Sequence, residues 1–128
     1  MKKALAITTQ GEVSTLDLSD SALEKLQGAV GGYVQAIDLC IDPTISMWCN
    51  EEGKMVGLPH NPFGQAFWEM AFPVSEYGKT DYIVGDIVIT GGVDSEGETL
   101  GLSDYEIEMS LKVVATVLAF ISPKVEIF

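Results

Sequence analysis

Apolar and polar residues alternate in four segments of the first fifty positions, a pattern typical of β-strands. Residues 3–8 and 12–18 flank Gln10-Gly11 and predict one hairpin, with glycine supplying a positive φ at the turn. Residues 33–40 and 45–50 predict a second hairpin around Asp42-Pro43-Thr44. The period of two along the returning strand places Trp48 and Asn50 on one face.

A fifth strand-like segment, residues 82–90, is rich in β-branched side chains and is expected to bend at Gly85. Residues 91–98 then predict an exposed acidic turn, and residues 74–80 a loop. The residues after Pro123 are expected to form a short terminal strand or tail.

The pattern predicts a first helix after residue 20. Ser21-Ala22-Leu23-Glu24 matches a capping box, in which the serine and glutamate side chains satisfy free amides. Leu23, Leu26 and Val30 supply its apolar stripe, and Gly31-Gly32 supplies a left-handed stop.

A second helix is expected to start at Asn61. An asparagine oxygen can accept from the first free amides, and Pro62 suits the first helical position because it has no N–H to lose. Pro73 ends this helix. Its apolar stripe has the spacing i, i+3, i+4 and i+7 and consists of Phe63, Ala66, Phe67 and Met70.

A third helix is predicted from a second capping box, Ser103-Asp104-Tyr105-Glu106, to about Ile121, before Pro123. Residues 113–121 are apolar on nearly every side, yet too few to cross a bilayer, which takes ~20 residues. Three structures remain open for them: a helix sunk in the concave face of a sheet, a buried strand, or a subunit interface.

These elements predict an α+β fold with a small antiparallel or mixed sheet and about three helices, the last long and hydrophobic. With 128 residues and 47% hydrophobic composition, the chain is long enough to bury a core. We therefore expect one domain over residues 1–128, with its C-terminal hydrophobic helix at about 104–121.

The net charge of the chain limits the classes of partner that it is expected to bind. Seven lysines and no arginine stand against 19 acidic residues, for a formal net charge of −12. This balance opposes binding to a phosphate backbone, so direct binding of duplex nucleic acid is not expected. The acidity is explained either by solubility or by imitation of a nucleic acid.

Cys40 and Cys49 are the only cysteines, and the chain shows neither a signal peptide nor an apolar run of membrane length. We expect a cytoplasmic protein of the bacterial host cell, with no membrane partner. The two cysteines lie at different distances from the predicted turn, so two buried thiols are expected rather than a disulfide.

Catalytic and metal-binding motifs are missing from the sequence. One histidine and two separated cysteines do not make a zinc site of the usual spacing. Residues 94–98 resemble a calcium loop, but Gly97 stands at the wrong position and Tyr105 falls where the loop needs a glutamate. Phosphate-binding glycine loops and nucleophile elbows are also missing. We therefore expect a non-enzymatic protein without a cofactor or metal.

A ligand pocket is the best remaining hypothesis. The start of the helix at Asn61 would point free amides at an anion, and neighbouring side chains would add charge or hydrogen bonds. Tyr33 and Trp48 offer faces on which a base can stack. The candidate ligand-binding residues are Tyr33, Trp48, Asn50, Lys54, His60, Asn61 and Gln65.

A structural explanation for the same residues stays open. Asn61 can be only a cap and His60 only a loop residue, while Tyr33 and Trp48 can be aromatic residues of the core.

Several short motifs occur in a fixed order: GGYV at residues 31–34, NEEGK at 50–54, GLPHNP at 57–62, IVGD at 83–86 and GET at 97–99. In this order, over about residues 28–106, the chain resembles a family of small uncharacterised domains encoded by bacteriophages, plasmids and integrated elements. The apolar segment from Val113 departs from that pattern.

The resemblance implies a protein of a mobile element, and such proteins often act on host defence. The favoured hypothesis is a protein that sequesters a small (cyclic) nucleotide immune signal and forms a homo-oligomer through the C-terminal helix. The alternative is an acidic inhibitor of a host defence protein. If residues 94–98 were extended, Asp94, Glu96 and Glu98 would project on one side, roughly 7 Å apart and near phosphate spacing.

Overall fold

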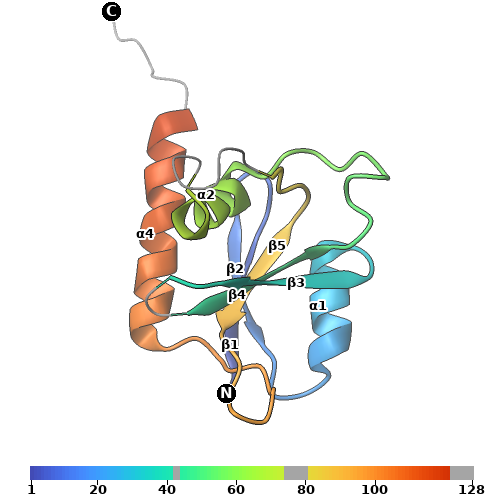
Figure 1. Cartoon of the computed structure of the whole chain (residues 1–128), viewed down its shortest axis with the longest axis vertical. Coiled ribbons are helices and arrows are strands. Elements are labelled where there is room, and N and C mark those ends of the chain that lie inside the picture. Colours follow the sequence, from blue (N-terminus) through green and yellow to red (C-terminus); the bar gives the residue numbers. More distant parts are fainter. Residues whose placement is uncertain (42–43, 74–80, 122–128) are drawn as a thin grey trace, which may run out of the picture.

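The computed structural model describes residues 1–41, 44–73 and 81–121. In this part of the chain, five strands form one sheet in the order β2-β1-β5-β4-β3, and every neighbouring pair is antiparallel. Helix α1 covers one face of the sheet, while α2 and α4 lie on the other (Figure 1). The predicted α+β fold is therefore confirmed. The strands are β1 (Lys3–Ile7), β2 (Val13–Asp17), β3 (Val34–Leu39), β4 (Ile45–Asn50) and β5 (Ile87–Gly91), and the helices are α1 (Ala22–Val30), α2 (Pro62–Ala71) and α4 (Asp104–Ile121).

Both predicted hairpins are present, β1 with β2 and β3 with β4. Gly11 adopts φ +86° in the first turn, where its N–H donates to the carbonyl of Thr8. β5 lies between the two hairpins and is buried along its whole length. The turn expected at Asp42-Pro43, the loop at 74–80 and the terminal strand or tail expected after Pro123 lie outside the described residues.

The strand predicted over residues 82–90 is shorter in the structure. Gly85, where a bend was expected, has φ +78° and interrupts the strand. Before this residue, Val84 forms only an isolated bridge with His60, and the continuous strand starts at Ile87. Residues 81–84 are consequently free to pass beside the start of α2 instead of extending the sheet.

Helix α1 departs from its predicted start. Ser21 adopts a left-handed conformation, with φ 52° and ψ 43°, and its side chain makes no capping hydrogen bond, so the expected capping box is wrong. Leu23 is 57% exposed, whereas Leu26 and Val30 pack on the sheet. The stop at Gly31 is confirmed, since this residue has φ 80° and its N–H donates to the carbonyl of Gln27.

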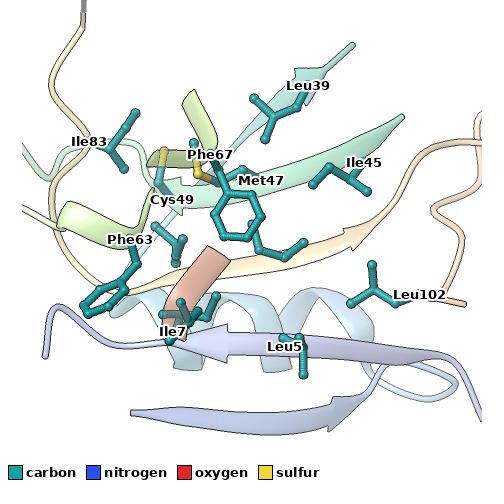
Figure 2. Packing of buried hydrophobic residues seen from close by; sticks show 13 residues of the cluster. Leu5, Ile7, Leu39, Ile45, Met47, Cys49, Phe63, Phe67, Ile83 and Leu102 are labelled. Atoms are coloured by element: carbon teal, nitrogen blue, oxygen red, sulfur yellow. The ribbon is translucent and has the colours of Figure 1, made fainter. Parts of the chain in front are cut away.

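The larger part of the core lies between the sheet and α2 with α4. Phe63 and Phe67 of α2 are fully buried over side chains such as Ile7 and Met47 of the sheet (Figure 2). The smaller part lies between α1 and the other face of the sheet, around Val88 of β5. β5 thus contributes to both parts, because its successive side chains point to opposite faces.

Helix α4 begins with the predicted capping box. The N–H of Ser103 donates to the carboxylate of Glu106, and the N–H of Glu106 donates to the serine hydroxyl. Residues 113–121 are helical, so the strand alternative is wrong. Only one side of the helix packs on the core, through residues such as Val114, and the opposite side is exposed. None of the described helices has the length and apolar composition needed to cross a bilayer.

The two cysteines have different environments. Cys49 is buried on β4, as expected, but Cys40 is exposed just after β3, so its predicted burial is wrong. The reason is position, since Cys40 lies beyond the last paired residue of the strand, Leu39. Both thiols are free, in agreement with the expectation that they form no disulfide.

Candidate functional site

The side chain of Asn61 is fully buried at the start of α2 and uses all of its hydrogen-bonding groups. Its oxygen accepts from the N–H groups of Phe63 and Gly64, each at 3.0 Å. Its Nδ2 donates to the carbonyl of Ile7 at 3.3 Å and to that of Gly85 at 2.8 Å. The predicted N-cap is confirmed, and the same amide also ties α2 to β1 and to the bend before β5.

This cap closes the anion site that the helix start was expected to offer. Pro62 has no N–H, the amides of Phe63 and Gly64 donate to the Asn61 side chain, and the amide of Gln65 donates to the Asn61 carbonyl. The first turn therefore has no free donor to aim at a phosphate. In this structure Asn61 organises the fold around the site rather than facing a ligand.

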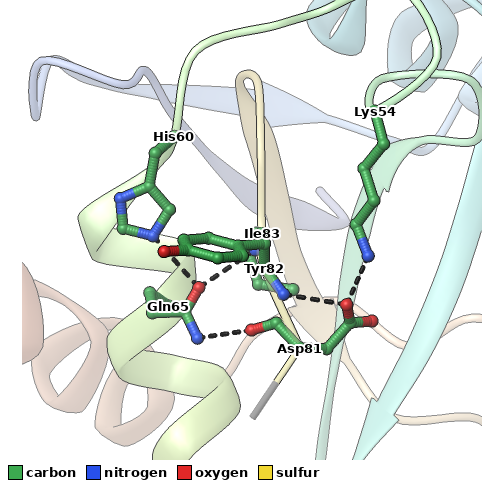
Figure 3. Close-up of polar contacts among 6 residues, drawn as sticks. All are labelled: Lys54, His60, Gln65, Asp81, Tyr82 and Ile83. Atoms are coloured by element: carbon green, nitrogen blue, oxygen red, sulfur yellow. Dashed lines mark hydrogen bonds and ion pairs between the residues drawn. The ribbon is translucent and has the colours of Figure 1, made fainter.

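His60 and Gln65 form a polar network with residues 81–83 (Figure 3). The Gln65 oxygen accepts from the N–H of Ile83 at 3.0 Å and lies 3.1 Å from Nε2 of His60. The amide Nε2 of Gln65 donates to the carbonyl of Asp81 at 2.6 Å. The ring of His60 meets that of Tyr82 edge to face, with centroids 5.2 Å apart. The network holds the segment before β5 against α2.

Lys54 joins the same segment from the other side. Its ammonium group donates to the carboxylate of Asp81 and forms an ion pair with it, and both side chains remain about half exposed. The hydrogen bond from Lys54 lowers the pKa of Asp81 below its ordinary value. Lys54 belongs to the turn that follows β4, so this pair links that turn to residues 81–83 (Figure 3).

Between these elements lies a cavity of about 450 Å³, which we call the Lys54 cavity. Burial raises the pKa of the Cys49 thiol at its wall. Within the described residues, the buried indole N–H of Trp68 has no hydrogen-bond partner, and the Trp68 ring stacks on Phe72 with centroids 4.3 Å apart. The residues that line the cavity include Gln35, Cys49, Lys54, Trp68, Phe72 and Tyr82.

Tyr33 lies at a different hollow, of about 360 Å³, at the end of α1. Asn50 borders both hollows, but its amide is engaged: Nδ2 donates to the carbonyl of Val30 at 3.2 Å, and Oδ1 accepts from the N–H of Glu52 at 2.8 Å. Tyr33 is 66% exposed and is not the core aromatic residue that the structural explanation described.

Trp48 is separate from both hollows. It packs with the cluster beneath α1, and its Nε1 donates to the hydroxyl of Thr90 at 3.0 Å. Trp48 and Asn50 do share the predicted face, toward α1.

The seven candidate residues thus fall into separate groups. Lys54, His60 and Gln65 meet through residues 81–83, Tyr33 and Asn50 meet at the end of α1, and Trp48 and Asn61 pack inside the protein. Sequence reasoning missed Trp68 and Phe72, whose spacing of four residues on a predicted helix was an available signal for adjacent rings. No local pattern in the sequence pointed to Asp81, because it lies 27 residues after Lys54 in the chain.

The acidic residues 94–98 form the predicted exposed turn, but the turn is closed. The carboxylate of Asp94 accepts from the N–H groups of Glu96 and Glu98, and Val93 bridges Thr99. The extended arrangement with phosphate-like spacing is therefore not formed. Across residues 1–41, 44–73 and 81–121, no group of three or more histidine, cysteine or acidic side chains is placed to hold a metal ion.

No curated protein and no solved structure matches this chain. One family model does match, described as a domain of unknown function, DUF3846, and it covers residues 1–115. The match runs from before β1 to the middle of α4, which is wider than the segment 28–106 that carries the short motifs, and it includes every residue of the Lys54 cavity. The chain therefore belongs to the DUF3846 family of uncharacterised domains.

Proposed function

We propose that this protein is a non-enzymatic binding protein of a phage or mobile element that sequesters a small nucleotide signal of host defence in the Lys54 cavity. The observation that carries the proposal is the combination of aromatic walls and a cation in one hollow of about 450 Å³. Its volume is in the range of small-molecule sites, about 300–1,000 Å³.

The cavity lining suits a ligand with an aromatic ring and a limited negative charge. Trp68, Phe72 and Tyr82 offer ring surface for a nucleobase. Lys54 is the one cation among the described lining residues; it is paired with Asp81, and the carboxylates of Asp81 and Glu51 also line the cavity. Because the whole chain carries −12, a ligand with few phosphates is favoured over a polynucleotide.

The titratable groups of the cavity support binding without catalysis. A general acid or base works best with a pKa near the ambient pH, and a cysteine nucleophile needs a low thiol pKa. Here burial moves the pKa of Cys49 upward, and Lys54 moves that of Asp81 downward. At neutral pH the thiol is protonated and the carboxylate is ionised, so neither group is poised for proton transfer.

The alternative, an acidic inhibitor of a host defence protein, has less support. Its specific basis was a row of acids with phosphate spacing, and residues 94–98 form a closed turn instead. If the cavity takes up no nucleotide, binding to a host protein is the next hypothesis to test.

The test is native mass spectrometry and calorimetry of the purified protein with cyclic mononucleotides, cyclic oligonucleotides and NAD-derived cyclic nucleotides. We expect one class to bind at whole-number stoichiometry. Lys54→Met, which keeps the apolar stem and removes the charge, should weaken binding about tenfold or more, since hydrogen bonds to charged groups contribute about 1.5–3 kcal/mol.

Lys25→Met is the matched control for that experiment. Lys25 is also an exposed lysine with a single acceptor, the carbonyl of Asp17, but it lies on α1, away from the Lys54 cavity. The control should bind like the parent. A folded parent that takes up no member of the panel would refute the proposed function, and equal losses in the two variants would refute the cavity as its site.

A further inference from the structure

Helix α4 carries a second unexplained surface, on the side away from the Lys54 cavity. Phe120 is 85% exposed, although a phenylalanine is usually buried. One turn before it, a mainly apolar groove of about 380 Å³ runs between α2 and α4. The groove is bordered by Met70 of α2 and by Met109, Val113 and Thr116 of α4, with Lys112 as its one charged residue.

The exposed ring and the groove lie on one face of the helix. Met109, Val113, Thr116 and Phe120 have the spacing i, i+4, i+7 and i+11, the periodicity of a seam between two packed helices. A projecting side chain and a recess therefore follow one another along the same stripe. Such a surface is complementary to itself when a second helix runs in the opposite direction.

A two-fold axis near Thr116 satisfies this complementarity. Phe120 is then four residues from the axis in one direction, and Lys112 is four residues from it in the other. Each Phe120 would enter the groove of the partner subunit beside Val113, and the partner's ring would do the same in return, as an isologous contact requires. Thr116 is small enough to let the helices approach closely at the axis.

Charge favours a second copy of this chain as the occupant. Two copies that each carry −12 repel one another over most of their surface, but residues 113–121 contain no charged side chain. An antiparallel pair also keeps the acidic first turns apart, each with Asp104 and Glu106, and aligns the helix dipoles favourably. A parallel pair would place these acidic turns side by side.

We propose that the protein is a homodimer in which α4 of the two subunits packs antiparallel, with Phe120 of each subunit in the α2–α4 groove of the other. The dimer does not depend on the proposed nucleotide binding, because the groove and the Lys54 cavity share no lining residue. It leaves both Lys54 cavities accessible.

The first experiment is analytical ultracentrifugation of the full chain over a range of concentrations. The parent should sediment as a dimer. Phe120→Lys should shift it to a monomer, raising the dimer dissociation constant at least a hundredfold, because it would place a second cation beside Lys112 of the partner subunit in each groove. Since the ring is so exposed in the single subunit, the monomeric variant should keep the circular dichroism spectrum of the folded parent.

Leu111→Lys is the matched control. Leu111 is an exposed apolar residue of the same helix, 42% accessible, and nine positions before Phe120, which places it on the opposite side of α4. This variant should remain dimeric. A monomeric parent, or a dimer that Phe120→Lys leaves intact, would overturn the proposal.

A cross-linking experiment tests the position of the axis. In a Cys40→Ser background, which removes the exposed thiol, Thr116→Cys should form an intermolecular disulfide under mild oxidation. Leu111→Cys in the same background should not. Cross-linking of the Leu111 variant alone would show that another face of α4 forms the contact and would overturn the arrangement.

Discussion

Asn61→Ala is expected to lower the free energy of unfolding by about 3–5 kcal/mol. The substitution removes four hydrogen bonds from a fully buried site. It leaves two helix amides and the carbonyls of Ile7 and Gly85 without their partner, and each unsatisfied buried group costs about 1–3 kcal/mol before relaxation. The loss should exceed the ~1 kcal/mol typical of an exposed cap.

Urea unfolding followed by circular dichroism measures this loss. Ser103→Ala is the matched control, because Ser103 also caps a helix through its side chain but is exposed. It should lower stability by about 1 kcal/mol. If Asn61→Ala cost no more than Ser103→Ala, the buried amide would not be the link between α2, β1 and the bend at Gly85.

Gly91→Ala is expected to cost about 2–4 kcal/mol, because the close approach of two backbone segments leaves no room for a methyl group. A Cβ on Gly91 would lie 2.6 Å from the carbonyl oxygen of Gly101 and 3.0 Å from that of Leu100. These carbonyls cannot easily withdraw. The N–H of Leu100 is bonded to the carbonyl of Gly92, and that of Leu102 to the carbonyl of Lys3.

Gly28→Ala is the counterpart that should stabilise the protein, by about 0.5–1 kcal/mol, since alanine is the better helix former. Gly28 lies inside α1, and a Cβ there would meet no atom within 4 Å. Thermal and urea unfolding of both variants give the comparison. Equal effects of the two substitutions would contradict the close backbone approach at Gly91.

Local patterns were sufficient to predict most elements of this fold. The hairpins follow from period-two alternation, and α2 and α4 follow from caps whose hydrogen bonds the structure contains. The cap at Ser21 failed because its backbone is left-handed, whereas a residue that caps through its side chain typically has an extended backbone. Which strand lies at the centre of the sheet was not predictable locally, because β5 pairs with strands from distant parts of the chain.

Local patterns were also insufficient to predict the arrangement of the candidate site. Neighbours in sequence were expected to act together, yet Asn61 turns into the core while His60, directly before it, stays exposed. Burial of a polar amide is tolerated here because every one of its groups is satisfied, a condition that depends on Ile7 and Gly85. Conversely, Lys54 finds its acceptor, Asp81, only after the chain has folded back.

The central place of β5 sets the order in which this protein can be completed during synthesis. Each hairpin is local and can form early, but β1 and β4 then present open edges until residues 87–91 leave the ribosome and pair with both. Until that moment the nascent chain holds two separate hairpins, each with an unpaired strand edge. Insertion of one strand closes both edges at once, and α4, which is synthesised after β5, then completes the cover of the core beside α2.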